Sequence, residues 1–144
     1  MGAIALKKHC KPSGAHYLSH IEDRMTVRSI SAITLSVTDI PRSVEFYRTT
    51  IGLVLLHREA NDSFVSFQIG DGFLNLVSSI NTKIQWWGRV IIYVDHVDAL
   101  YNKIIASGWH ISGRPQDAQW GERYFHVMDP DGHELSFASP IIKR

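Results

Sequence analysis

The order of structural signals in this chain repeats once, with a spacing of about 57 residues. Each half contains a β-branched strand, a helical pattern that ends at a glycine, and then three short strands. Corresponding positions are Val37 and Val94 at the ends of the opening strands, Ile40 and Val97 at the helix starts, and Gly52 and Gly108 at the helix stops. The sequence therefore predicts two tandem βαβββ modules.

The boundaries of these elements follow from local signals. Thr38 and Asp39 are favourable residues at a helix start, and Pro41 suits the first helical turn. Asn61-Asp62 and Gly70-Asp71-Gly72 are typical hairpin turns. In the first module we expect strands at 30–37, 53–57, 64–69 and 73–77. In the second we expect strands at 90–94, 109–112, 124–128 and 134–138, with a helix over 97–106.

A four-stranded module alone would leave one face of its sheet uncovered. The predicted fold class is therefore α+β, with the two modules forming a shared cleft and the helices covering the outer faces. We expect one domain over 27–140, with modules at 27–80 and 87–140. Residues 1–26 lack periodicity and are expected to be an appended, flexible segment, and 141–144 a tail. Small ligands commonly bind in clefts of this kind.

Composition excludes several classes of partner. The 144 residues carry a net charge of +1, which gives little attraction to nucleic acid or to an anionic membrane. No apolar run approaches the roughly 18 residues of a membrane helix. The single cysteine, Cys10, cannot form an internal disulfide, which favours a cytoplasmic location. We therefore expect a small-molecule ligand.

Two segments resemble a known family. Residues 33–47, ITLSVTDIPRSVEFY, and 125–137, FHVMDPDGHELSF, are similar to the vicinal oxygen chelate superfamily. This superfamily includes glyoxalase I, extradiol dioxygenases, fosfomycin-resistance enzymes and bleomycin-resistance proteins. The resemblance covers about residues 28–140 and implies the glyoxalase/bleomycin resistance/dioxygenase fold. It does not select one activity, because one fold carries many functions.

The resemblance also places four metal-ligand positions on this chain. They fall on Ala32, Asn75, Arg89 and Ser136, and none of these is the His, Gln or Glu that the enzymes use. An arginine at such a position would repel a divalent ion. We therefore expect no metal and no other cofactor. A shift of two residues on the closing strand would bring Glu134 to the ligand position instead.

Other side chains are candidates for binding an organic ligand. Arg89 and Glu134 must either bind groups of opposite charge or pair with each other. Tryptophans 86, 87 and 120 suggest a stacking surface or an aromatic plug. Of the histidines in the second half, His126 alone lies mid-strand, whereas His96, His110 and His133 are expected at the surface. The predicted ligand-binding set is Arg89, Glu134, Ser136, Asn75, Ala32, Trp87, Tyr93, Trp120, Phe125 and His126.

Two functions remain open at this point. The first is metal-independent binding of a small aromatic or amphipathic molecule, as in the bleomycin-resistance relatives. The second is a metal-dependent glyoxalase-type lyase or isomerase, thiol transferase or extradiol dioxygenase, which would need a divalent metal. A ligand-sensing or interaction module is a third, weaker possibility. The resemblance further implies a homodimer. Asp39, Asp129 and Asp131 are assigned to helix-cap and turn roles rather than to catalysis.

Overall fold

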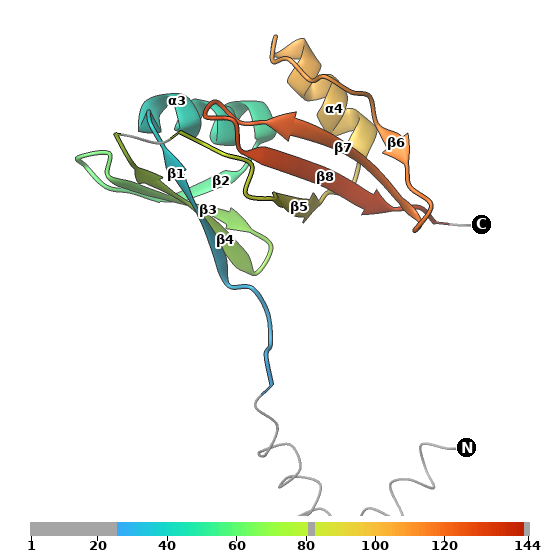
Figure 1. Ribbon diagram of the computed structural model, residues 1–144, viewed down its shortest axis with the longest axis horizontal. Helices are drawn as coiled ribbons and strands as arrows, with labels where there is room; N and C mark the ends of the chain where they lie inside the picture. The colour runs from blue at the N-terminus through green and yellow to red at the C-terminus, as the bar shows by residue number, and fades with distance from the viewer. Residues whose placement is uncertain (1–25, 81–82, 143–144) are drawn as a thin grey trace, which may run out of the picture. The chain divides into compact units, whose positions relative to one another are not determined.

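The computed structural model describes residues 26–80 and 83–142 and confirms the two βαβββ modules (Figure 1). The predicted flexible segment at 1–26 lies almost entirely outside the described residues. The first module contains β1 (Ala32–Val37), α3 (Ile40–Glu45), the π-helical segment η1 (Phe46–Ile51), β2 (Val54–Arg58), β3 (Phe64–Ile69) and β4 (Gly72–Ser78). The second contains β5 (Arg89–Tyr93), α4 (Val97–Ala106), β6 (Gln116–Asp117), β7 (Glu122–Met128) and β8 (Glu134–Pro140).

Each module forms its own four-stranded mixed sheet. The strand order is β1-β4-β3-β2 in sheet A, which belongs to the first module, and β5-β8-β7-β6 in sheet B, which belongs to the second. The opening strand of each module runs parallel to the closing strand, and the other neighbours are antiparallel. Ala32, the first residue of β1, lies opposite Phe73, and its counterpart Arg89, the first residue of β5, lies opposite Glu134. The opening and closing strands therefore pair in the same way in both sheets.

The first helix starts where the sequence predicts. The Asp39 carboxylate accepts a hydrogen bond from the backbone N–H of Arg42 at 3.0 Å and so caps α3. The helix continues into η1 and ends at Gly52, whose φ of 96° lies in the left-handed region. In the second module, α4 spans the predicted residues.

Apolar side chains on one face of each sheet pack against the helices, which lie along the same side of the strands (Figure 1). In sheet A these include Leu35, Val65 and Leu74, and in sheet B they include Val127 and Leu135. Alternation along a strand sends every second side chain to the opposite face, which no helix of residues 26–80 or 83–142 covers. This open face of sheet B carries the candidate site.

Polar contacts join the two modules through the turn between β7 and β8. The Asp131 carboxylate accepts hydrogen bonds from the Thr38 N–H at 3.0 Å and the Thr38 hydroxyl at 2.6 Å. The buried Asp129 carboxylate accepts one from the Tyr47 hydroxyl at 2.7 Å. The His133 ring lies 2.8 Å from the Ser36 carbonyl oxygen. His133 is only 5% exposed, so its expected surface position is wrong.

One predicted strand is also wrong. Residues 109–112 follow α4 without joining the sheet, and the short β6 lies further along the chain. Trp109 instead packs against Phe46, with ring centroids 4.7 Å apart, and its indole donates to the Met128 carbonyl oxygen at 3.0 Å. Side-chain contacts therefore hold this segment, whereas the sequence predicts the backbone hydrogen bonds of a β-strand. No helix among the described residues is long and apolar enough to cross a membrane.

Candidate functional site

Alternate residues of β5, β7 and β8 bring polar and aromatic side chains together on the open face of sheet B. They surround a cavity of about 160 Å³, called here the sheet-B pocket. Its walls are Arg89, Ile91, Trp120, Glu122, Tyr124, His126, Ser136 and Ala138. Four residues of the predicted ligand-binding set therefore lie together: Arg89, Trp120, His126 and Ser136.

The Arg89 guanidinium occupies the centre of a hydrogen-bond network. Its Nε donates to the Glu134 carboxylate at 2.9 Å, and its Nη1 lies 3.1 Å from the His126 Nε2. The Trp86 indole donates to the same Glu134 oxygen at 2.9 Å. Arg89 and Glu134 thus form the ion pair that the sequence left as one of two options. The positive charge of Arg89 is compensated inside the protein.

These contacts fix the protonation states of the two neighbours. The hydrogen bond from Trp86, followed by the contacts with Arg89, lowers the pKa of Glu134, which therefore stays ionised. Burial lowers the pKa of His126, and the Arg89 charge lowers it further. Because arginine can only donate, the His126 Nε2 accepts this hydrogen bond, as it does in the neutral form of the ring. Its buried Nδ1 has no partner among the described residues.

Trp120 and Tyr124 form an aromatic wall of the pocket. Trp120 stacks on Tyr124 with ring centroids 5.9 Å apart and an interplanar angle of 22°. The Glu122 carboxylate holds this wall, because one oxygen accepts from the Trp120 indole at 2.9 Å and the other from the Tyr93 hydroxyl. Trp120 is 72% exposed and Tyr93 is 62% exposed, so both rings are available to a ligand.

The sequence reasoning missed Glu122 and Tyr124. Glu122, Tyr124 and His126 are alternate residues of β7, so their side chains lie on the same face of the sheet. Placing His126 on the open face therefore predicts that Glu122 and Tyr124 lie there too. The same parity explains why the placement of Phe125 in the cleft is wrong. Phe125 points to the core, where its ring contacts Tyr101 and Phe137.

The other predicted residues lie outside the sheet-B pocket. The Trp87 indole donates to the His133 Nδ1 at 2.8 Å. Ala32 and Asn75 belong to sheet A, where the Asn75 side chain accepts from the Ser66 hydroxyl at 2.8 Å. The lining of the sheet-B pocket comes from the second module alone, whereas the sequence predicts a cleft shared by both modules.

A divalent metal does not fit the four positions that the family resemblance indicates. Ala32 has no donor atom, Arg89 is a cation, and Asn75 and Ser136 are neutral. Among the described residues, no group of three or more His, Cys, Asp or Glu side chains is arranged to hold a metal ion. The chemistry available in the sheet-B pocket is therefore stacking, hydrogen bonding and charge pairing.

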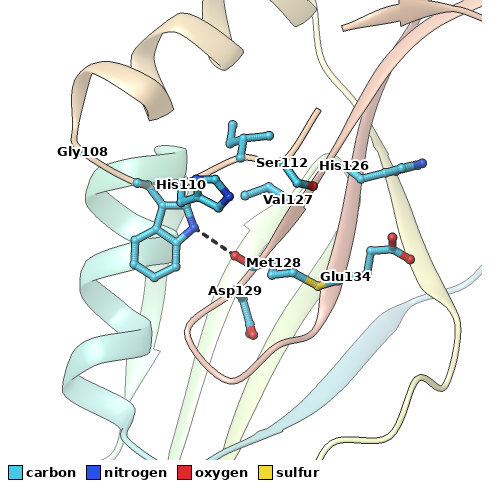
Figure 2. Close-up of a pocket in the computed structure, with 10 residues that line it drawn as sticks. Gly108, His110, Ser112, His126, Val127, Met128, Asp129 and Glu134 are labelled. Carbon is cyan, nitrogen blue, oxygen red and sulfur yellow. Dashed lines mark hydrogen bonds between the residues drawn. The ribbon is translucent and has the colours of Figure 1, made fainter. Parts of the chain in front are cut away.

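A second and larger cavity, called here the edge pocket, lies beside the outer edge of β7 and has a volume of about 390 Å³ (Figure 2). It exists because residues 109–112 form no strand beside β7. Its two carboxylates are engaged elsewhere: Asp129 binds Tyr47, and Glu134 binds Arg89. In Figure 2 the side chains of His126 and Glu134 point away from His110. We therefore place the candidate site in the sheet-B pocket, although it is smaller.

Comparisons with known proteins agree with this architecture. The metallothiol transferase FosB of Lysinibacillus sphaericus (strain C3-41) is 30% identical over 120 residues, covering 78% of this chain and 83% of the relative. The bleomycin resistance protein of Geobacillus stearothermophilus is 28% identical over 125 residues, covering 74% and 93%.

Solved structures give the same result. The crystal structure of TioX from Micromonospora sp. ML1 matches with a TM-score of 0.67 and 25% identity, covering 79% of this chain and 100% of that one. A putative glyoxalase family protein from Bacillus anthracis matches with a TM-score of 0.69 at 16% identity, covering 81% and 98%. The family model described as Glyoxalase/Bleomycin resistance protein/Dioxygenase superfamily matches residues 29–137. The chain belongs to this superfamily.

Proposed function

We propose that the protein binds a small aromatic or amphipathic molecule in the sheet-B pocket without a metal ion. The observation that carries the proposal is the stacked pair of Trp120 and Tyr124 beside the polar groups of Arg89 and Ser136. Aromatic walls with a few fixed polar groups are typical of small-molecule sites. A relative is named as a bleomycin resistance protein.

The proposal includes a homodimer. The sheet-B pocket is smaller than the roughly 300 Å³ at which ligand pockets usually begin. Large apolar side chains on the same open face are exposed, including Ile91 at 59%. A second copy over this face would deepen the pocket and cover these residues. A stable 16 kDa monomer in sedimentation velocity would contradict this part of the proposal.

Quenching of tryptophan fluorescence tests the binding itself. Acridine, a planar probe that is neutral at mildly alkaline pH, should quench the wild type equally with and without a chelator. Stacking contributes about 0.5 to 1.5 kcal/mol per aromatic contact, so Trp120→Ala should weaken binding by about twofold to twelvefold. Arg89→Ala should also weaken it, because Glu134 and His126 lose the group that orders them.

Trp87→Phe is the matched control, because this indole lies outside the pocket walls. It should leave the acridine affinity unchanged. Binding that disappears with chelator would instead support a metal-dependent enzyme. Two relatives are named as enzymes, the metallothiol transferase FosB and a lactoylglutathione lyase from Haemophilus influenzae. Unchanged affinity in both the Trp120 and Arg89 variants would place the ligand elsewhere. The cytoplasmic location stays a prediction.

A further inference from the structure

The charges around the sheet-B pocket do not balance. Arg89 is paired with Glu134 at 2.9 Å, so these two charges compensate each other. His126 accepts a hydrogen bond from Arg89 and is neutral. Glu122 also lines the pocket, and it forms no ion pair with any described residue. The pocket therefore retains one uncompensated negative charge.

The neighbouring residues of Glu122 do not supply the missing cation. Arg123 follows it in β7 but points to the other face, where its guanidinium binds Asp98 at 2.6 Å and Asp117 at 2.8 Å. Within the described part of the chain, only neutral donors contact the Glu122 carboxylate, namely the Tyr93 hydroxyl and the Trp120 indole. These hydrogen bonds favour the ionised form of the carboxyl group.

The same contacts place the charge next to the aromatic wall. The Trp120 ring that Glu122 orients is the ring that stacks on Tyr124. A ligand lying on this wall would meet both a carboxylate and an exposed aromatic face. Each of these attracts a positive charge, the first by Coulombic attraction and the second by a cation–π interaction.

We infer that Glu122 makes the sheet-B pocket selective for planar cations over planar anions. This inference rests on the proposed function, because it assigns a charge to the ligand of the same pocket. Its ligand class is a flat aromatic or heteroaromatic cation. Arg89 does not select a carboxylate, because its own charge is already taken by Glu134.

Three tricyclic probes of matching shape test the inference on the full chain: 10-methylacridinium as the cation, acridine as the neutral molecule and acridine-9-carboxylate as the anion. One unpaired charge near a solvated site is worth about fivefold in affinity, so the cation should bind about fivefold tighter than acridine, and the anion more weakly. Glu122→Gln should abolish this order, because an amide carries no charge although its oxygen can still accept from Trp120. Glu45→Gln, on the exposed side of α3, makes the same change in net charge and should preserve the order.

A second measurement on the wild type does not depend on any variant folding. Raising the salt concentration should reduce the preference for the cation and leave acridine binding unaffected. Equal affinities for the three probes, tighter binding of the anion, or a preference that survives Glu122→Gln would overturn the inference while leaving the proposed function intact. Failure of all three probes to bind would overturn the proposed function, and this inference with it.

Discussion

Asp129 is the most deeply buried acidic side chain among the described residues, at 3% exposure. One carboxylate oxygen accepts hydrogen bonds from the backbone N–H groups of Asp131 at 3.0 Å and His133 at 2.8 Å, and the other accepts from Tyr47. The sequence predicts the turn role, which needs only neighbouring residues. It does not predict the bond to Tyr47, because nothing local indicates which distant hydroxyl will reach the carboxylate.

Tyr47→Phe should destabilise the protein by about 1 to 3 kcal/mol, since it leaves a buried carboxylate oxygen without its donor. Urea unfolding measures the free energy of unfolding directly. Tyr101→Phe is the control, because the Tyr101 ring packs on Phe125 but its hydroxyl has no described partner. Equal losses in the two variants would show that the Tyr47 hydroxyl contributes nothing specific.

The charge state of Asp129 gives a pH dependence. Burial raises its pKa in the folded protein, whereas the unfolded chain should titrate near about 3.9. Between the two pKa values the folded state binds more protons, so this contribution to stability is present below the unfolded pKa and is lost as the pH rises through the folded pKa. Asp129→Asn cannot ionise and keeps an oxygen for the two backbone donors.

The stability of wild type relative to Asp129→Asn should therefore fall as the pH rises from about 4 towards 7. Urea titrations of both proteins at several pH values give this difference. A constant difference across the range would mean that the carboxyl group titrates alike in the folded and unfolded chains.

At the scale of elements, local signals predict the helix starts and most strands, because caps, turn residues and alternation are properties of neighbouring residues. They do not predict η1, and they predict a strand at 109–112 that does not form. A strand forms only where a neighbouring strand accepts and donates its backbone hydrogen bonds. Here the Trp109 ring instead packs against Phe46, and its indole donates to the Met128 carbonyl oxygen. Ile111 is buried all the same, which is why its pattern resembles that of a strand.

Gly52 ends the first helix in a conformation that other residues rarely adopt. Its φ is 96°, and a Cβ at this position would lie 2.8 Å from the Lys103 Nζ. Gly52→Ala should therefore cost about 1 kcal/mol or more in unfolding free energy. The Lys103 side chain can move aside, so backbone strain should dominate. Gly113→Ala, which has no contact within 4 Å and no left-handed φ, should change stability by less. Thermal or urea unfolding compares the two.

At the scale of the whole molecule, the repeat determines the architecture. The helix starts and glycine stops recur in the sequence, so both modules could be predicted. The sequence also predicts part of the candidate site, since Arg89, Ser136 and His126 face the sheet-B pocket. The contacts between modules could not be predicted, because they break the repeat: Asp131 binds Thr38, whereas the corresponding Asp71 is exposed and has no described partner.

Asp131→Ala removes the hydrogen bonds that Thr38 and, at 3.5 Å, the Ser43 hydroxyl donate to this carboxylate, and it should lower the free energy of unfolding by about 1 to 2 kcal/mol. Asp71→Ala is the matched control in the equivalent turn and should have an effect within about 0.5 kcal/mol. Chemical denaturation followed by tryptophan fluorescence reads mainly the second module. Agreement between this signal and far-UV circular dichroism would show that the modules still unfold together. Equal destabilisation by the two substitutions would contradict the bridging role of Asp131.

The bond between Trp109 and β7 has a consequence for self-association. The Glu122 carbonyl oxygen binds the Ala118 N–H, so alternate residues of β7 direct their backbone groups outward, including His126 and Met128. Among the described strands, only the short β6 lies beside this edge of β7, so the remaining groups would offer a template on which another chain could add a strand and begin to aggregate. The Trp109 indole donates a hydrogen bond to the Met128 carbonyl oxygen, and the segment from Gly108 to Ser112 lies beside this edge of β7. A single bulky side chain thus protects an edge that the first module covers with the whole of β2.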